Sequence, residues 1–255
     1  MSGNTNCCLT EIGPRRGLAL WIAGMVGVLA AAFIMVPALI RQRQHRPLRR
    51  PLWVISVLQC VQGGLLLALF AWGGAVLSAR VGLHAWVFEA LVEGRSWTTP
   101  LVRQLIPGLI AGVVLAVIPW YFVSHSLIYK IASPRMLFVG ISYGGITEEI
   151  FMRWGLMTFL VWLGWRILQR SHGVPSFAIV WTAIIASAVI FGAGHLPATY
   201  QLQGHLTGVA IFSVIGGGAV FGVVTGYLYW RYGLESAMIC HATAHICAYV
   251  ACKII

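Results

Sequence analysis

The sequence contains very little negative charge. Among its 255 residues there is no aspartate and there are only six acidic residues, all glutamate, and charged residues of both signs make up 9% of the chain. Hydrophobic residues account for 59%, and the mean hydropathy is +0.85. A soluble domain of this length needs far more charge to cover its apolar surface. The composition therefore excludes a soluble globular protein and indicates a polytopic membrane protein.

The sequence also lacks a disulfide framework and a nucleic-acid-binding pattern. Its six cysteines have no framework spacing, so a disulfide scaffold is not expected. The formal net charge of +11 comes from basic residues in short gaps between apolar runs, as in loops that face anionic headgroups. We therefore expect the bilayer, and not nucleic acid, to be the partner of this charge.

The apolar runs predict an all-α, polytopic transmembrane bundle of about seven spans, within a range of six to eight. The predicted organisation is a polar N-terminal tail (1–16), N-terminal transmembrane helices with a basic loop (17–135) and a C-terminal transmembrane core (136–252). A short interfacial helix is expected at 85–93. The gap 41–51 carries five arginines, which places it on the cytoplasmic side by the positive-inside rule. The seven predicted spans are 17–40, 52–78, 105–124, 136–165, 174–191, 206–230 and 234–251.

Three charged residues interrupt the fourth apolar run. Charge within a bilayer is costly unless it is partnered, so such residues indicate function. On a helix, Glu149 and Arg153 are four residues apart and share a face, which predicts a structural ion pair. Glu148 points about 100° away from Glu149 and has no local partner. The sequence therefore predicts one free carboxylate inside the membrane.

Three histidines lie in other apolar runs and are candidates to meet this carboxylate. His195 ends the fifth run, and His241 and His245 share one face of the seventh. We expect the polar site between the fourth, fifth and seventh spans. In one chemistry, a divalent metal such as zinc, with His195, His241 and Glu148 as candidate ligands, activates a water whose proton Glu148 takes. In the other, Glu148 deprotonates a water held by His195, while His241 and His245 donate hydrogen bonds to the oxyanion.

A rival motif is Gly140-Ile141-Ser142-Tyr143-Gly144, which matches the G-x-S-x-G nucleophile elbow. The elbow needs a strand-to-helix turn, which an apolar membrane run does not supply. Gly140 and Gly144 are more simply explained as a packing face for a neighbouring helix. The same interpretation applies to the glycines at 218, 222 and 226.

These residues resemble the CPBP intramembrane proteases, a family that includes the type II CAAX prenyl endopeptidases and proteins linked to bacteriocin processing and immunity. Its Glu-Glu-x-x-x-Arg motif matches 148–153, Phe-x-x-x-His matches 191–195, and His-x-x-x-Asn/Asp matches 241–245. The resemblance implies that Glu148 activates the hydrolytic water and that His195 fixes this water or a metal. His241 and His245 are implied to polarise the scissile carbonyl. Position 245 departs from the family, which usually has Asn or Asp there.

The leading hypothesis is therefore an intramembrane endopeptidase that hydrolyses a peptide bond in a hydrophobic or prenylated protein substrate. The alternative is a non-catalytic immunity or binding protein that uses the same cavity. A proton or ion pathway is a third interpretation, because buried Glu and His also build proton relays. The expected location is a bacterial cell membrane, as a multi-pass integral protein.

Overall fold

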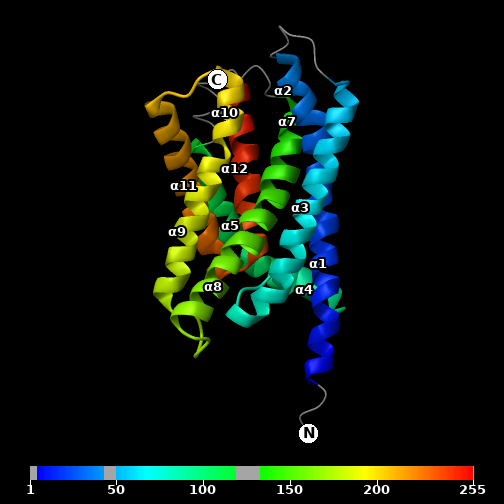
Figure 1. Cartoon of the computed structure of the whole chain (residues 1–255), viewed down its shortest axis with the longest axis vertical. Helices are drawn as coiled ribbons and strands as arrows, with labels where there is room; N and C mark the ends of the chain where they lie inside the picture. Colours follow the sequence, from blue (N-terminus) through cyan, green and yellow to red (C-terminus); the bar gives the residue numbers. More distant parts are fainter. Residues whose placement is uncertain (1–4, 43–49, 119–132, 255) are drawn as a thin grey trace.

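The computed structural model describes residues 5–42, 50–118 and 133–254, and these residues form a bundle of helices (Figure 1). No strand occurs within these ranges. Six helices are long and apolar enough to cross a membrane. The N-terminal elements are α1 (Thr5–Ala30), η1 (Ala31–Met35), α2 (Val36–Gln42), α3 (Leu52–Val81), α4 (Trp86–Val92) and α5 (Thr98–Leu115). The C-terminal elements are α7 (Pro134–Val139), η3 (Gly140–Glu148), η4 (Ile150–Met157), α8 (Thr158–Leu168), α9 (Phe177–Gly194), α10 (Leu196–Gln203), α11 (Gly208–Arg231) and α12 (Leu234–Ile254).

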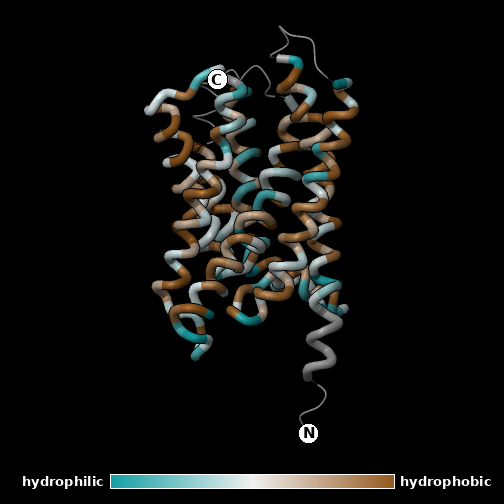
Figure 2. Tube along the Cα trace, viewed as in Figure 1, coloured by the Kyte–Doolittle hydropathy of each residue, from teal (hydrophilic) through white to brown (hydrophobic). Residues whose placement is uncertain are grey.

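The span count agrees with the sequence prediction, because the fourth run crosses the bundle as a succession of helical segments. The six candidate spans are 13–41, 52–81, 98–115, 177–201, 208–231 and 234–254, and α7, η3, η4 and α8 supply the seventh. Figure 2 shows hydrophobic residues along most of each helix. The third span begins earlier than predicted, at Thr98, and its predicted end at 119–124 lies outside the described residues. The chain is an integral, multi-pass membrane protein.

The fourth span is a continuous helical path with an unusual interior. Ser133 caps it, since its side chain accepts a hydrogen bond from the Met136 N–H at 3.3 Å. From Gly140 to Met157 the helix is almost entirely of the π type, in which each N–H bonds the carbonyl five residues earlier. Such stretches are rare and often mark functional sites. This segment carries both glutamates of the predicted site.

Glycines set the distances between neighbouring helices. A Cβ on Gly222 of α11 would lie 2.7 Å from the Ala188 Cα of α9, and one on Gly226 would lie 3.1 Å from Ile184. The predicted role of this glycine face in packing is therefore confirmed. On the other side of the bundle, a Cβ on Gly108 of α5 would lie 2.8 Å from the Ser236 carbonyl of α12. Close packing of this kind is how membrane helices associate without a hydrophobic driving force.

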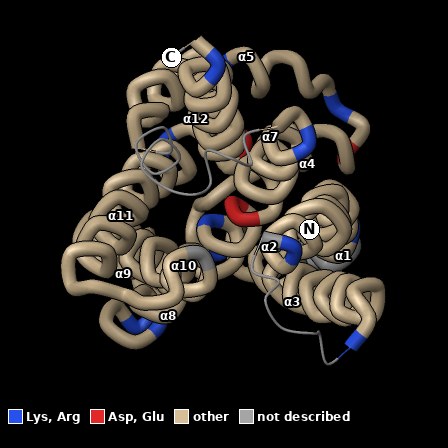
Figure 3. Tube along the Cα trace, turned by 90° about the horizontal axis from the view of Figure 1, so that it is seen from above, with Lys and Arg blue, Asp and Glu red and all other residues tan. Residues whose placement is uncertain are grey.

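The helix α4 matches the range predicted for a short interfacial helix and is held by a buried carboxyl group. Glu235, at the start of α12, accepts hydrogen bonds from the N–H groups of Val87 and Phe88 at 2.8 and 3.0 Å. These N–H groups would otherwise be unsatisfied, because they lie in the first turn of a helix. Figure 3 shows that most charged residues lie near the margin of the bundle, whereas an acidic segment and a basic segment lie close to its centre. The central groups belong to the site described next.

Candidate active site

The site residues come from three parts of the chain that the fold brings together. Glu148 ends η3, and Glu149 directly follows it. His195 stands at the junction of α9 and α10, two residues before Pro197. A proline has no N–H, so the hydrogen-bond ladder is interrupted there and the chain changes from α9 to α10. His241 and His245 lie on α12.

Glu149 contacts two other residues of the site, His241 and Arg153. Its Oε1 atom accepts a hydrogen bond from His241 Nδ1 at 2.7 Å. Its Oε2 atom lies 3.1 Å from Arg153 Nε, so the ion pair expected from the sequence is present, and both side chains have no exposed surface. This contact is ionic and not a hydrogen bond, because the Arg153 Nε–H points to the Thr225 hydroxyl at 3.0 Å. Glu149 therefore joins the histidine to the arginine, a double role that the sequence spacing did not reveal.

Arg153 is held by an acceptor on α11 that the sequence analysis missed. Both Nε and Nη2 of Arg153 donate to Thr225 Oγ1. The guanidinium also lies 5.0 Å from the centre of the Phe191 ring, within range for a cation–π interaction. Thr225, Arg153, Glu149 and His241 thus form one buried polar chain. No sequence motif singled out Thr225, which is one of several threonines in apolar helices.

Glu148 has a different environment from Glu149. Its Oε2 atom lies 4.0 Å from His241 Nε2, and its side chain keeps 21% of its surface exposed, whereas Glu149 keeps none. A separation of 4.0 Å is too long for a hydrogen bond, but it is short enough for one oxygen atom beside the two groups to lie about 2.8 Å from each. The carboxylate predicted to be free is therefore near a histidine and has no direct hydrogen bond to it.

His195 is oriented by its own helix. Its Nδ1 lies 2.9 Å from the Phe191 carbonyl oxygen, which can only accept, so Nδ1 carries the proton. The lone pair on Nε2 is then available in the neutral ring. The Phe191 ring meets His195 and His241 edge-on, with ring centres 4.8 and 6.0 Å apart. Phe191 thus packs between two of the candidate histidines.

His245 stacks on His241, with ring centres 5.1 Å apart and planes 16° from parallel. It also lies within electrostatic range of His195. Glycines in η3 make room for both rings of α12: a Cβ on Gly144 would lie 2.8 Å from His245 Nε2 and 3.2 Å from His241 Nε2. The glycine packing face predicted at 140 and 144 is therefore packed against the imidazoles.

The donor chemistry suits a zinc ion only in part. In the neutral rings, the Nε2 atoms of His195 and His241 and the Glu148 carboxylate are the N and O ligands that zinc prefers. Each Nδ1–H has an acceptor, as is usual for histidines that bind metals. However, within the described ranges no three His, Cys or Glu side chains are close enough to hold one ion. As these side chains lie, they do not form a metal site.

Ser142 is not arranged as a nucleophile. It lies inside the helical segment η3, where its hydroxyl donates to the Phe138 carbonyl at 2.6 Å. Its backbone carbonyl accepts from Thr147 Oγ1 at 3.3 Å and faces Gly27 of α1. This is a helix–helix contact and not a strand-to-helix elbow.

One comparison with known proteins found a match. Residues 130–247 match the family model described as Type II CAAX prenyl endopeptidase Rce1-like. No curated protein and no solved structure matches the chain. The matched region contains Glu148, Glu149, Arg153 and all three candidate histidines. This family supports a protease that works within the membrane on a protein substrate. Over residues 130–247, the chain is therefore similar to the Rce1-like type II CAAX prenyl endopeptidase family.

Proposed function

We propose that this protein is an intramembrane endopeptidase in which Glu148 activates the hydrolytic water. The observation that carries the proposal is the position of Glu148 Oε2, which is partly exposed and lies 4.0 Å from His241 Nε2, so that one oxygen atom beside them can lie within hydrogen-bonding distance of both. Glu148 is also the acidic group of the site that keeps solvent-accessible surface. It is therefore the carboxylate that a water can reach.

In the proposed reaction, Glu148 takes a proton from the water as its oxygen bonds to the scissile carbonyl carbon. The carbonyl oxygen becomes an oxyanion. When the C–N bond breaks, the proton held by Glu148 passes to the leaving nitrogen, and the products are a carboxylic acid and an amine. One group thus acts as base and then as acid, which requires that it sit within hydrogen-bonding distance of both atoms.

The histidines have separate parts in this scheme. His195 accepts a hydrogen bond from the water through its free Nε2 lone pair. His241 already donates its Nδ1–H to Glu149, so it donates a second hydrogen bond, to the oxyanion, only as an imidazolium. The buried Glu149 carboxylate stabilises that charged form, as an acidic partner does for a catalytic histidine. His245 stacks on His241. We propose that it helps His241 to polarise the scissile carbonyl.

A bound zinc ion, if the protein holds one, would supply Lewis-acid polarisation of the water or the carbonyl. Its ligands would be His195, His241 and Glu148. No step above depends on it, because these side chains are not arranged as a metal site.

The proposed substrate is a hydrophobic or prenylated protein segment at the membrane surface. The family match is to prenyl endopeptidases, and the site lies in a chain with several helices long and apolar enough to cross a membrane. We therefore expect the farnesylated form of a peptide to be cleaved faster than the same peptide without the lipid.

The test is cleavage of a quenched fluorescent farnesylated peptide by the purified protein in liposomes, with the cut bond located by mass spectrometry. We expect Glu148→Gln and His195→Ala to reduce kcat by at least about a thousandfold, and Ser142→Ala to remain active. Removal of metal with a chelator, followed by metal analysis, separates the two hydrolytic schemes. Full cleavage by Glu148→Gln would contradict the proposal.

The departure at position 245 favours one second candidate. Histidine replaces the usual Asn or Asp there, so a non-catalytic immunity or binding protein using the same cavity is the alternative function. The two functions are distinguished by comparing cells that carry the wild-type protein with cells that carry Glu148→Gln. If the protein only binds, the phenotype that it confers is kept in the variant, and if it is a protease, that phenotype is lost.

A further inference from the structure

Two glutamines lie on the exposed side of α3, inside the membrane. Trp53, near the start of the helix, is 68% exposed and suits the membrane interface. Gln59 and Gln62 follow six and nine residues later, roughly 9 and 14 Å deeper along the helix axis. Both are exposed. A carboxamide that faces hydrocarbon without a partner costs several kcal/mol, so its place in an otherwise apolar helix needs a reason.

Neither carboxamide serves as a contact between helices. Among the described residues, Gln59 and Gln62 have no hydrogen-bond partner, and the same holds for the hydroxyl of Tyr143 on η3. Polar residues that join membrane helices are bonded to the neighbouring helix. The two carboxamides and the Tyr143 hydroxyl are therefore available to donate and accept hydrogen bonds with a ligand.

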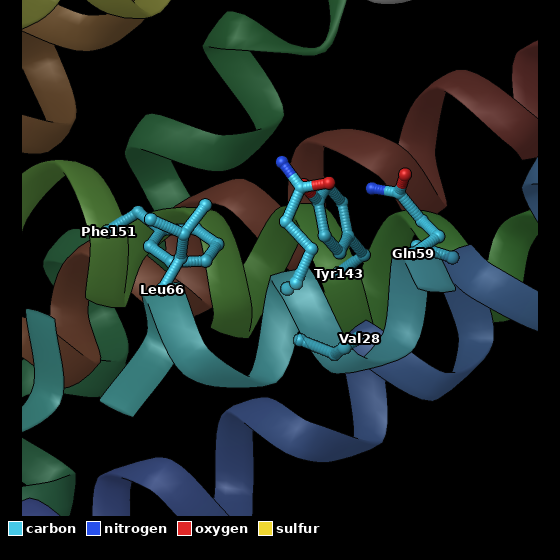
Figure 4. Close-up of a pocket in the computed structure, with 8 residues that line it drawn as sticks. Val28, Gln59, Leu66, Tyr143 and Phe151 are labelled. Atoms are coloured by element: carbon cyan, nitrogen blue, oxygen red, sulfur yellow. The ribbon is translucent and has the colours of Figure 1, made fainter. Parts of the chain in front are cut away.

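The three polar groups line one cavity of about 90 Å³ between α1, α3 and the fourth span (Figure 4). Figure 4 shows Gln59 and Tyr143 next to each other above α3, with Leu66 and Phe151 further along the same side. The lining residues are Val28, Ala31, Gln59, Gln62, Gly63, Leu66, Tyr143 and Phe151. We call this space the Gln59–Tyr143 cavity.

One wall residue of the cavity lies on the same helix as the proposed catalytic carboxylate. Tyr143 precedes Glu148 by five residues, which is the hydrogen-bonding interval of the π-helix that contains both. The Tyr143 wall of the cavity is therefore about one helical turn away from Glu148 along η3.

The lining chemistry selects an uncharged polar ligand. No lining residue is charged, so nothing in the cavity compensates the charge of a phosphate, a carboxylate or an amine. A glutamine side chain has an amide N–H and a carbonyl, and so does each unit of a peptide backbone. The cavity has the volume of a few water molecules, which fits a peptide group and excludes a lipid headgroup.

We propose that Gln59, Gln62 and Tyr143 form a subsite that binds one peptide group of the substrate backbone, about one helical turn from Glu148. This inference rests on the proposed function and names the part of the substrate that is held. The carboxamides replace the water that an unfolded segment loses as it enters the membrane. The subsite binds peptide groups of any sequence, while the apolar side of the cavity contacts side chains.

The test uses binding, so that it does not depend on cleavage. The affinity of a fluorescently labelled farnesylated peptide, and of the same peptide without farnesyl, is measured by anisotropy for Glu148→Gln protein in nanodiscs. Adding Gln59→Leu and Gln62→Leu is expected to weaken the binding of the farnesylated peptide by about tenfold or more, since at least two hydrogen bonds are lost. Leucine suits a lipid-facing position, and thermal unfolding checks that the fold is kept. Tyr143→Phe, which removes only the hydroxyl, should weaken binding about threefold.

The matched control is Leu65→Gln, which places the same carboxamide on an exposed part of α3 outside the cavity and should leave affinity unchanged. Equal affinity of the double variant, or no measurable binding of either peptide, overturns the subsite. If the wild-type protein cleaves but the double variant binds normally, the proposed function stands and the subsite is wrong. If binding falls as expected but the wild-type protein does not cleave, the subsite stands and the proposed function is wrong.

Discussion

At the scale of single residues, two adjacent glutamates have opposite environments. Glu149 has no exposed surface, accepts a hydrogen bond from His241 and forms an ion pair with Arg153, whereas Glu148 keeps 21% of its side-chain surface and lies 4.0 Å from His241. A buried carboxylate with two partners is fixed in position, while a partly exposed one is accessible to water. In the proposed mechanism, Glu149 therefore orients His241, while Glu148 reacts with the water.

Thr225 gives the sharpest prediction at this scale. Thr225→Val keeps the volume of the side chain but removes the acceptor for Arg153, which leaves a buried guanidinium unsatisfied. We expect the free energy of unfolding to fall by about 1 to 3 kcal/mol. Through Arg153 and Glu149, His241 loses its orientation, so kcat should fall about tenfold with little change in KM.

Thr225→Ser is the matched control, because it keeps the hydroxyl. It should restore most of the activity, and the pH profile of kcat should return to that of the wild type. If Ser and Val variants lose activity equally, Thr225 acts through packing and the buried chain does not position His241.

At the scale of elements, the π-helical stretch and its glycines decide how close α12 comes to the carboxylates. An alanine at Gly144 would bring its Cβ to 2.8 Å from His245 Nε2, closer than side chains pack. The rings of His241 and His245 would have to move by a few tenths of an ångström. A shift of this size is large for catalysis, which depends on positions held within about 0.5 Å.

We therefore expect Gly144→Ala to fold normally and to lose at least about tenfold in kcat. Alanine at an open helical position usually stabilises, by up to about 1 kcal/mol. Gly216→Ala is the control, because a Cβ there meets nothing within 4 Å. Thermal unfolding and peptide cleavage measured on both variants separate a loss of stability from a loss of geometry. Equal kcat in the two variants would contradict the packing role.

At the scale of the whole molecule, a second polar cluster lies beside α4, at the end of the bundle nearest the N-terminus (Figure 1). It consists of Arg16, His84 and Glu89. Burial by itself raises the pKa of Glu89, but the hydrogen bond and charge of His84 and the charge of Arg16 outweigh it, so the pKa of Glu89 is lowered. His84 Nδ1 lies 3.2 Å from the Glu89 carboxylate, and Arg16 Nη1 lies 3.5 Å away. These contacts join α4 to α1.

A lowered pKa in the folded state means that the Glu89 charge stabilises the fold above about pH 4.5, its ordinary pKa. That stabilisation is lost as the pH falls through the lower folded value. At pH 7 we expect Glu89→Gln to be less stable by about 2 kcal/mol. The difference in Tm between this variant and the wild type, measured in detergent, should shrink towards zero in strong acid. A constant difference from pH 7 down to pH 3 would show that Glu89 acts through shape alone.

The sequence by itself determined the class of the fold and the residues to suspect. Apolar runs longer than a bilayer is thick can only be membrane helices, and charge inside such a run is too costly to be accidental. The four-residue interval between Glu149 and Arg153 was enough to predict their ion pair, because it depends on one helix alone.

Only the tertiary structure decided which groups meet across helices. The bond between His241 and Glu149 joins residues 92 positions apart, and Thr225 is 72 positions from Arg153. These pairings depend on how closely the helices approach, which glycines at 144, 222 and 226 set through the atoms they leave out. Contacts between different helices cannot be predicted from the residue intervals within one helix, because the packing of the spans against each other brings the partners together.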